Sequence, residues 1–235
     1  MVPVRKKSGE IRLCVGFRNL NRASDKYNYP VPPMEQLLQM VSGYELFSLL
    51  DGFSSYNQVL VVEEDRLKMT FRTRWGTFAY RRMPFGLINA GATFQRAMDI
   101  AFHGLIGHSA VVYLDDITIF SKKRDEHAFH LKHIFERCRK YGISLNPKKC
   151  VFSITKGKLL GHMVSKKGIS IDPERIKAIE YIPLPHNKKG IQSFMGTINF
   201  MRRFVPYFAQ IVKPLQQMVK KSVQFKWNDV EKNVF

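Results

Sequence analysis

The chain has 235 residues, 45% of them hydrophobic, which is enough to bury the core of one large domain or of two to three smaller ones. Lys and Arg number 38 against 19 Asp and Glu, and this net charge of +19 favours a polyanionic partner, nucleic acid before an anionic membrane surface. No run of about 18 apolar residues is present, which argues against a membrane span. Three scattered cysteines argue against a disulfide framework or a zinc site and fit a reducing compartment.

The first part of the chain mixes short strands with helices. Residues 2–15 have the alternating pattern of a β-hairpin with a turn at residues 7–10. Three prolines between residues 30 and 33 predict an extended connector before a short helix at residues 34–41. A short helix or turn is predicted at residues 54–56. Further strands are predicted at residues 44–50, 58–62, 68–71 and 78–83.

Helices dominate later in the chain. Asn89 is predicted to cap a helix, residues 124–141 form an amphipathic helix, and residues 151–154 and 158–164 predict a second hairpin. From Asp172-Pro173, which caps a helix, the pattern is all-helical, with a break expected at Pro214. This change predicts a subdomain boundary near residue 169. Residues 181–226 contain no Asp or Glu but eight Lys and Arg, as expected of a segment that lies along phosphates.

Two carboxylates interrupt the most strongly β-forming stretch of the chain. The apolar runs 110–114 and 117–120 are separated by Asp115 and Asp116, so we predict a tight hairpin with both carboxylates at its tip. An ordinary surface hairpin is the alternative interpretation. Asp51 ends another predicted strand, and three carboxylates converge if the two strands are neighbours in one sheet.

Such a cluster predicts a cation site, because like charges raise one another's pKa unless a cation neutralises them. Mg²⁺ takes one or two carboxylates together with substrate phosphates. Two such ions about 3.5–4 Å apart activate an attacking 3′-hydroxyl and stabilise a leaving pyrophosphate. A basic chain with this site is typical of a nucleotidyl-transfer polymerase.

Five segments, in this order, resemble motifs of reverse transcriptases. They are residues 47–58 (FSLLDGFSSYNQ), 85–95 (FGLINAGATFQ), 113–116 (YLDD), 142–150 (GISLNPKKC) and 160–163 (LGHM). The third resembles the YxDD box and the last resembles the primer grip. The set is similar to the polymerase region of gypsy-type LTR retrotransposons, particularly plant ones, and covers essentially the whole chain. It implies an α+β fold, a right-hand polymerase with partial fingers, a palm with an antiparallel sheet and a helical thumb.

The resemblance implies a role for each matched position. Asp51, Asp115 and Asp116 match the catalytic aspartates, which would hold two Mg²⁺ ions with Mn²⁺ as a substitute, and Lys149 matches a lysine that protonates pyrophosphate. The implied nucleotide-binding residues are Lys6, Arg12, Tyr56, Phe85 and Gly86. The implied template–primer residues are Tyr113, Gln95, Leu160, Gly161, His162, Met163, Arg202 and Arg203.

Some positions have a second interpretation. Tyr56 matches the aromatic that excludes a 2′-hydroxyl, and it is also explained as a core tyrosine. Lys6 is adjacent to Lys7, and either is also explained as a solvated hairpin lysine. Two positions depart from the family pattern, with Gly16 in place of the usual Asp and Gly91 in place of the commoner Pro. No metal site is predicted at His127, His130 and His133, because a spacing of three does not bring side chains together on a helix.

The implied organisation is fingers at residues 1–43 and 57–89, palm at 44–56 and 90–169, thumb at 170–224, and a linker to an RNase H domain at 225–235. The family's usual segment before Val2 is missing, so we expect a piece of a Pol polyprotein that also holds protease, RNase H and integrase regions. The expected function is RNA-directed DNA synthesis from dNTPs on an RNA or DNA template–primer, in a cytoplasmic particle whose product DNA passes to the nucleus. The alternatives are a non-catalytic nucleic-acid-binding remnant and, more distantly, a basic peripheral membrane protein, although no membrane partner is expected.

Overall fold

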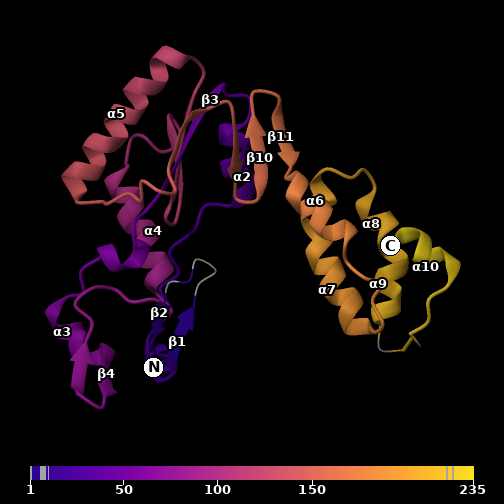
Figure 1. The fold of residues 1–235 in the computed structure, drawn as a ribbon, viewed down its shortest axis with the longest axis horizontal. Helices are drawn as coiled ribbons and strands as arrows, with labels where there is room; N and C mark the ends of the chain where they lie inside the picture. Colours follow the sequence, from indigo (N-terminus) through magenta and orange to yellow (C-terminus); the bar gives the residue numbers. More distant parts are fainter. Residues whose placement is uncertain (1, 6–8, 10, 221, 224) are drawn as a thin grey trace. The chain divides into compact units, whose positions relative to one another are not determined.

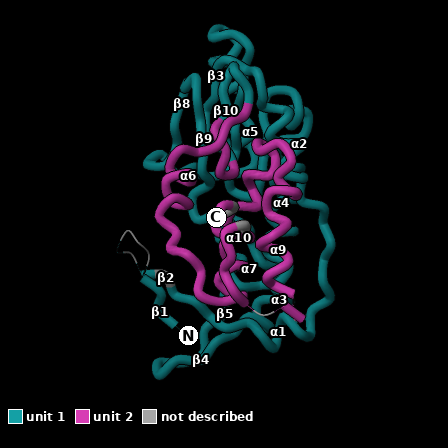
Figure 2. The backbone as a smooth tube through the Cα atoms, turned by 90° about the vertical axis from the view of Figure 1, so that its right-hand side faces the viewer, with its two compact units in different colours: residues 1–159, 164–168 teal, residues 160–163, 169–235 magenta. Residues whose placement is uncertain are grey.

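The structure is a computed structural model that describes residues 2–5, 9, 11–220, 222–223 and 225–235. The chain divides into two compact units (Figure 2). Unit 1 contains residues 1–159 and 164–168, and unit 2 contains residues 160–163 and 169–235. Each unit has its own apolar core. No helix in the described part of the chain is long and apolar enough to cross a membrane.

A four-stranded antiparallel sheet, here called the central sheet, organises unit 1. Its order is β6-β7-β3-β8, and its strands are β6 (Ala110–Tyr113), β7 (Asp116–Ser121), β3 (Leu46–Asp51) and β8 (Val151–Ile154). All residues of β7 after Asp116 are buried, because helices cover both faces of the sheet. The predicted mixed fold with an antiparallel sheet is therefore confirmed.

Three helices cover the central sheet. They are α4 (Ala90–Ala101), α5 (Arg124–Tyr141) and α2 (Met34–Val41). Phe94 of α4 and Ile134 of α5 share one core with Leu50 and Ile117 of the sheet. Figure 1 shows α5 and α2 on opposite sides of β3. Both α2 and α5 have the bounds that the sequence predicts.

Short elements make up the remainder of the N-terminal region. They are β1 (Val2–Arg5), β2 (Ile11–Cys14), α1 (Arg18–Ala23), η1 (Ser55–Gln58), α3 (Glu63–Arg66), η2 (Leu67–Met69), β4 (Thr70–Thr73) and β5 (Gly76–Ala79). The predicted hairpin of β1 and β2 is confirmed. The strand predicted at residues 58–62 is wrong, since this segment makes only an isolated bridge between Leu60 and Arg82.

The second predicted hairpin is also wrong. Strand β8 joins the central sheet, where Ile154 pairs with Phe47 and Val151 pairs with Leu49 of β3. A separate three-stranded sheet of order β11-β10-β9 follows, made of β9 (Lys156–Leu159), β10 (His162–Ser165) and β11 (Gly168–Ile171). Strands β8 and β9 have only four residues each, which is too short for sequence periodicity alone to assign their partners.

Unit 2 is helical after β11. Its helices are α6 (Pro173–Glu180), α7 (Lys188–Ile198), η3 (Asn199–Arg203), α8 (Phe208–Ile211), α9 (Lys213–Val219) and α10 (Asp229–Val234). The Asp172 carboxylate accepts a hydrogen bond from the Glu174 backbone N–H at 3.1 Å, which confirms the predicted cap. The break before Pro214 is confirmed, because α8 and α9 are separate helices with Pro214 in the first turn of α9.

Candidate active site

The register of the central sheet brings two of the three predicted carboxylates together. Asp51 is the last residue of β3 and Asp116 is the first residue of β7, and the two are direct partners across the antiparallel pair. On the other side of β7, Asp116 is the partner of Tyr113 at the end of β6. Side chains of direct partners lie about 4.5–5.5 Å apart at Cβ. The neighbouring strands that the sequence analysis required are therefore present.

The tip of the β6–β7 hairpin differs from the prediction. Leu114 and Asp115, rather than the two aspartates, form the turn, and Asp116 belongs to β7. Leu114 has a positive φ of 54°, which is strained for this side chain. Gln95 of α4 stabilises the turn, because its side-chain oxygen accepts a hydrogen bond from the Leu114 N–H at 2.7 Å.

Backbone hydrogen bonds join three segments at this edge of the sheet. The Gly52 N–H donates to the Asp115 carbonyl at 2.9 Å, and the Asn146 N–H donates to the Asp51 carbonyl at 2.8 Å. Gly52 is buried, and a Cβ built on it would lie 3.5 Å from Asp115, in ordinary van der Waals contact, so the two loops pack closely at this position. Asp51 and Asp115 are thus held by the backbone as well as by their own side chains.

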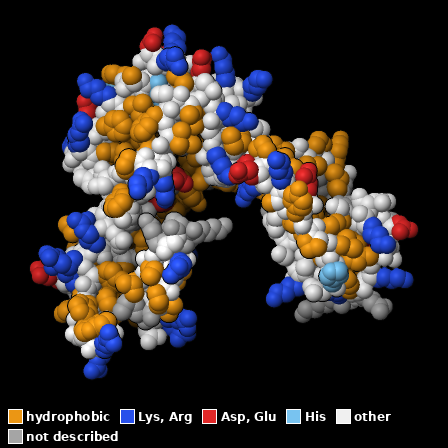
Figure 3. Space-filling model, viewed as in Figure 1, with side chains coloured by type: hydrophobic (Ala, Val, Ile, Leu, Met, Phe, Trp, Pro, Cys, Tyr) orange, Lys and Arg blue, Asp and Glu red, His pale blue; other side chains and the backbone are white. Residues whose placement is uncertain are grey.

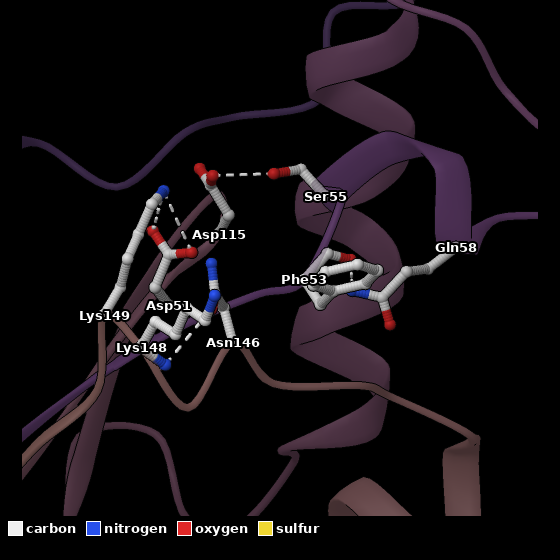
Figure 4. Close-up of polar contacts among 8 residues, drawn as sticks. All are labelled: Asp51, Phe53, Ser55, Gln58, Asp115, Asn146, Lys148 and Lys149. Atoms are coloured by element: carbon white, nitrogen blue, oxygen red, sulfur yellow. Dashed lines mark hydrogen bonds and ion pairs between the residues drawn. The ribbon is translucent and has the colours of Figure 1, made fainter. Parts of the chain in front are cut away.

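Each carboxylate has a different side-chain environment, and Figure 4 shows those of Asp51 and Asp115. The Lys149 ammonium lies 3.0 and 3.2 Å from the two oxygens of Asp51, while the Ser55 hydroxyl donates to Asp115 Oδ2 at 2.7 Å. The hydrogen bond to Asp51 raises the pKa of Lys149. The pKa of Asp116 is raised, first because its carboxyl is partly removed from water and then because of the nearby negative charges of Asp115 and Asp51. The residue as a whole is nevertheless exposed.

The loop after Asp51 contains two residues that the sequence analysis did not single out. Ser54 and Ser55 both have positive φ values, 57° and 40°, a conformation that costs free energy in residues other than glycine. The Gln58 side chain accepts from the Ser144 N–H at 2.7 Å and donates to the Phe53 carbonyl at 2.7 Å. This fixes the loop that presents Ser55 to Asp115. A serine pair directly after a strand-ending Asp-Gly-Phe is the only sequence signal for this conformation.

A cavity of about 840 Å³ opens beside the carboxylates. Asp51, Asp115 and Lys149 line it together with the aromatic side chains of Tyr80 and Phe85. Further lining residues come from the N-terminal hairpin and from three other segments: Ile11, Leu13, Gly52, Phe53, Ser54, Ser55, Asn57, Pro84, Asn146 and Lys148. The arrangement has the size and mixed polarity that a small charged ligand with one flat group requires.

The carboxylates fit a divalent cation that a ligand helps to bind, rather than a closed protein site. No group of three or more His, Cys, Asp or Glu residues in the described ranges is arranged to hold a metal ion by itself. Asp51 and Asp115 nevertheless both face the cavity, and Asp116 lies close enough for their charges to raise its pKa. Hard carboxylate oxygens supplemented by phosphate oxygens are the set that Mg²⁺ prefers.

The predicted nucleotide-binding residues lie at different distances from this cavity. Phe85 lines it, and Tyr56 packs against Phe85 and Phe94 with ring centroids 5.1 and 5.4 Å away. Tyr56 therefore also satisfies its core interpretation. Gly86 is exposed with a φ of 98°. The backbone of Arg12 belongs to β2, opposite Val4. Lys6 lies outside the described residues.

The predicted template–primer residues are divided between the two units. Gln95 is fully buried, so its side chain supports the Leu114 turn instead of facing a ligand. Tyr113 is half-buried beside Asp116. The other predicted residues belong to unit 2: Leu160, Gly161, His162 and Met163 at the β9–β10 turn, and Arg202 and Arg203 in η3.

Two of the three histidines on α5 lie closer together than their spacing predicts, because His127 and His130 both hydrogen-bond to the Ser121 hydroxyl. His127 is buried, and its ring nitrogens hydrogen-bond to the hydroxyls of Ser48 and Ser121 at 2.7 and 2.8 Å. His130 bonds to Ser121 as well, while His133 packs against Phe129. The first two histidines thus connect α5 to β3 and β7 behind the carboxylates.

Comparison with known proteins agrees with this geometry. Residues 4–164 match the family described as reverse transcriptase (RNA-dependent DNA polymerase). The chain belongs to this family. Reverse transcriptases as a family use divalent metal ions, which agrees with the carboxylates of the site. The matched range includes Asp51, Asp115, Asp116 and Lys149.

Curated relatives of this reverse transcriptase chain are far longer than the chain itself. The Tf2-3 and Tf2-7 transposon polyproteins of Schizosaccharomyces pombe are both 33% identical to it over 228 residues, which is 97% of this chain and 17% of each polyprotein. The chain therefore spans about a sixth of the length of these relatives. Nothing in this similarity shows a plant origin.

Solved structures show the same fold. The foamy viral protease-reverse transcriptase in complex with an RNA/DNA hybrid matches with a TM-score of 0.84 and 23% identity, over 99% of this chain and 31% of that chain. A second structure of that enzyme, in complex with double-stranded DNA, matches with a TM-score of 0.90 and 23% identity, over 99% and 49% of the two chains. The described chain thus has the fold of a reverse transcriptase.

Proposed function

We propose that the chain is the polymerase region of a gypsy-type retrotransposon Pol polyprotein and that it catalyses RNA-directed DNA synthesis. One observation carries this proposal. The carboxylates of Asp51 and Asp115 line one cavity with Lys149, and Asp116 is the direct strand partner of Asp51. A basic chain with this arrangement, in the reverse transcriptase family, has the parts that nucleotidyl transfer needs.

In this proposal the chain's own residues position the reactants. Asp51, Asp115 and Asp116 would hold two Mg²⁺ ions, for which Mn²⁺ could substitute, and such ions would favour loss of the proton from the primer 3′-hydroxyl and neutralise charge on the pyrophosphate. The 3′-oxygen forms a bond to the α-phosphorus, and the bond from that phosphorus to the pyrophosphate oxygen breaks. Lys149, which lies beside Asp51, donates a proton to the pyrophosphate as it leaves.

The remaining predicted residues act on the substrates. Phe85, which lines the cavity, contacts the incoming dNTP. The ring of Tyr56, which packs against Phe85, lies beneath the sugar of the dNTP and excludes a 2′-hydroxyl. Lys6, Arg12 and Gly86 complete the nucleotide site. Residues 160–163, Arg202 and Arg203 contact the template–primer backbone. The negative phosphates of this backbone attract the chain, whose net charge is +19.

The same proposal includes the organisation of the chain and its setting. Residues 1–43 and 57–89 form the fingers, residues 44–56 and 90–169 the palm, and residues 170–224 the thumb, followed by a connection to RNase H. In the whole polyprotein, protease and integrase regions accompany them, and synthesis takes place in a cytoplasmic particle. The length of the curated relatives supports a polyprotein of this kind.

The test is dNTP incorporation on a poly(rA)/oligo(dT) template–primer with Mg²⁺, for the wild type and for Asp115→Asn. We expect the substitution to lower incorporation by at least roughly 10³-fold, because a carboxylate ligand is lost where charge develops. Binding of the template–primer, measured by fluorescence anisotropy, should change less than about threefold, since affinity depends mainly on phosphate contacts.

Two results would overturn the proposal. Equal loss of binding and incorporation would make Asp115 a structural residue. Salt-sensitive binding without incorporation, from this chain and from a version extended at its N-terminus with polyprotein sequence, would favour the non-catalytic remnant. Activity from the extended version alone would place the missing determinant in the fingers and keep the assignment of Asp115.

A further inference from the structure

The β4–β5 hairpin exposes apolar and aromatic side chains that no part of the described chain covers. All four residues of β5 are exposed, and the two strands form a sheet of their own. Trp75 is 74% exposed and Phe78 is 48% exposed. A lone two-stranded hairpin gains little stability from such side chains, and exposed apolar groups gathered in one element indicate a binding surface.

The turn presents two side chains in a fixed arrangement. Arg74 and Trp75 are its two central residues, because Thr73 pairs with Gly76. The Thr73 hydroxyl accepts from the Trp75 N–H and donates to the Gly76 carbonyl, both at 3.1 Å. The Arg74 guanidinium lies 4.1 Å from the centroid of the Trp75 ring. One face of the indole is therefore already stacked, which leaves the other for a flat ligand.

A row of aromatic rings connects this hairpin to the nucleotide cavity. Phe71 and Phe78 are direct partners across the strands, with ring centroids 6.0 Å apart and a tilt of only 26°. Phe71 packs against Tyr80 at 5.3 Å, and Tyr80 lines the cavity beside the carboxylates. The hairpin thus lies next to the predicted nucleotide site, within unit 1.

The charge of this segment indicates which class of ligand its exposed aromatic side chains bind. No Asp or Glu occurs in residues 66–98, whereas seven basic residues do: Arg66, Lys68, Arg72, Arg74, Arg81, Arg82 and Arg96. Arg66 and Lys68 pair with Glu63 and Asp65 at 3.4 and 2.6 Å, so Arg72 and Arg74 are the basic residues that the hairpin itself presents. In Figure 3, Lys and Arg side chains surround hydrophobic ones at the end of unit 1 where Figure 1 places β4. Aromatic residues interleaved with basic ones stack bases and neutralise phosphates, and they do so best on a strand whose bases are unpaired.

We propose that the β4–β5 hairpin binds unpaired single-stranded nucleic acid, with one base stacked on Trp75 and its phosphates beside Arg72 and Arg74. This rests on the proposed function, in which the bound strand is template that has not yet reached the cavity. The ligand is a flexible polyanion with flat groups, which fits both the exposed rings and the absence of acidic residues from this segment.

The test compares two labelled template–primers, one blunt and one with a ten-nucleotide 5′ template overhang, by fluorescence anisotropy in the absence of dNTPs. Trp75→Ala should weaken binding of the overhang duplex by about tenfold, the loss expected for one stacked base, and leave the blunt duplex within about twofold. Phe129→Ala is the matched control, because Phe129 is another exposed aromatic of unit 1, 58% exposed on α5. It should change neither affinity.

Intrinsic fluorescence gives a second readout, since the chain has only two tryptophans. Titration with oligo(dT) should quench the wild type more than Trp75→Phe, whose remaining tryptophan is Trp227 in unit 2. An equal loss of both duplexes in Trp75→Ala, or no loss at all, would overturn the proposal. Self-association of the wild type that Trp75→Ala abolishes, without a change in overhang binding, would instead make the hairpin a protein interface.

These measurements separate the two proposals, because neither needs catalysis. If the chain fails to incorporate dNTPs but Trp75→Ala weakens binding of the overhang duplex alone, the strand-binding surface is supported and the polymerase function is contradicted. Normal incorporation with no overhang-specific loss would retain the polymerase and remove the surface. Arg74→Ala should reduce the dependence of log Kd on log salt by about one, as expected when one phosphate contact is lost.

Discussion

Two regions of unit 1 present functional side chains in opposite ways. At the carboxylate edge of the central sheet, each reactive group has a partner from a distant segment: Lys149 for Asp51 and Ser55 for Asp115. At the β4–β5 hairpin, the Trp75 N–H donates to the Thr73 hydroxyl and the Arg74 guanidinium stacks on the Trp75 ring, so these two residues have partners within their own turn. Chemistry at a phosphorus requires groups fixed in advance, while the capture of a flexible strand requires accessible rings and charge.

This difference predicts different consequences for substitutions in the two regions. A change at the carboxylate edge should lower the rate of synthesis and leave affinity for the template–primer almost unchanged. A change at the hairpin should lower affinity for unpaired strands and leave the rate at saturating template unchanged. A substitution with both effects would show that the regions are not independent.

The largest effect after loss of a carboxylate is expected at Lys149. Lys149→Gln should lower kcat by roughly 10²-fold, because it removes the proposed proton donor to pyrophosphate. Lys149→Arg keeps a positive charge near Asp51 but holds its proton too firmly to donate it. Single-turnover incorporation at saturating dNTP is the measurement. If Lys149→Arg restored the rate, the charge beside Asp51 would matter and proton transfer would not.

A smaller loss is expected at Ser55. Ser55→Ala removes the hydroxyl that orients Asp115, which should lower kcat and Mn²⁺ affinity by about tenfold each, as outer partners of metal ligands commonly do. Mn²⁺ binding is measured by electron paramagnetic resonance without nucleic acid, so this readout does not depend on turnover.

Two further variants separate positioning from backbone strain. Ser54→Ala is the matched control, since Ser54 shares the positive φ but is exposed. Ser55→Gly relieves the strain of a φ of 40°, so it should raise the thermal midpoint while kcat still falls. Equal effects of Ser54→Ala and Ser55→Ala on Mn²⁺ affinity would contradict a positioning role for the Ser55 hydroxyl.

The carboxylate edge was the more predictable of the two regions. Asp51 ends an apolar strand, and Asp115 and Asp116 interrupt another, so hydrophobic pattern and charge together predicted their convergence. The turn itself was misplaced by one residue, because Leu114 adopts a positive φ and its N–H donates a hydrogen bond to the distant Gln95. A non-local hydrogen bond of this kind leaves no mark on local sequence.

The segment that precedes the β4–β5 hairpin shows where pattern fails for a different reason. Residues 58–62 are rich in β-branched and apolar side chains like a strand, yet the Gln58 side chain bonds to the backbone of Phe53 and Ser144, and a short helix ends there. Asn89 is the N-cap residue of α4 as predicted, but its side chain binds the backbone of Tyr27 and Asp25 instead of its own helix. In both cases a polar side chain, that of Gln58 or Asn89, hydrogen-bonds to backbone that is distant in the sequence.

The next expected effect is a pH dependence of stability, and it concerns His127 of α5. Burial, with the nearby charge of His130 adding to it, lowers the pKa of His127 below its usual 6.5. The unfolded chain therefore takes up a proton before the folded chain does, so stability is fully present above about pH 6.5 and falls as the pH drops. The slope contributed by one site is at most about 1.4 kcal/mol per pH unit.

This dependence is measured by urea unfolding between pH 5 and pH 7.5. His127→Gln should be less stable at neutral pH, since two hydroxyls lose a buried partner, but its stability should vary less with pH. His108→Gln, at an exposed position, is the control and should retain the wild-type slope. An unchanged slope in His127→Gln would assign the acid sensitivity to other groups.

The smallest expected effect is at the turn of the hairpin. Thr73→Ala removes the hydroxyl that accepts from the Trp75 N–H and donates to the Gly76 carbonyl, so the indole loses its fixed direction without losing exposure or charge. Affinity for the overhang duplex should fall about twofold, and the fluorescence anisotropy of Trp75 should fall with it, while kcat stays the same.

Thr77→Ala provides the comparison, because Thr77 is exposed in β5 opposite Arg72 rather than at the turn. Thr73→Ser should behave as the wild type, since it retains the hydroxyl. If Thr73→Ala instead lowered kcat, the hairpin would communicate with the cavity through Phe71 and Tyr80, and the two regions would form one functional unit. The binding of unpaired strands is independent of catalysis only if Thr73→Ala lowers the affinity for the overhang duplex and leaves kcat unchanged.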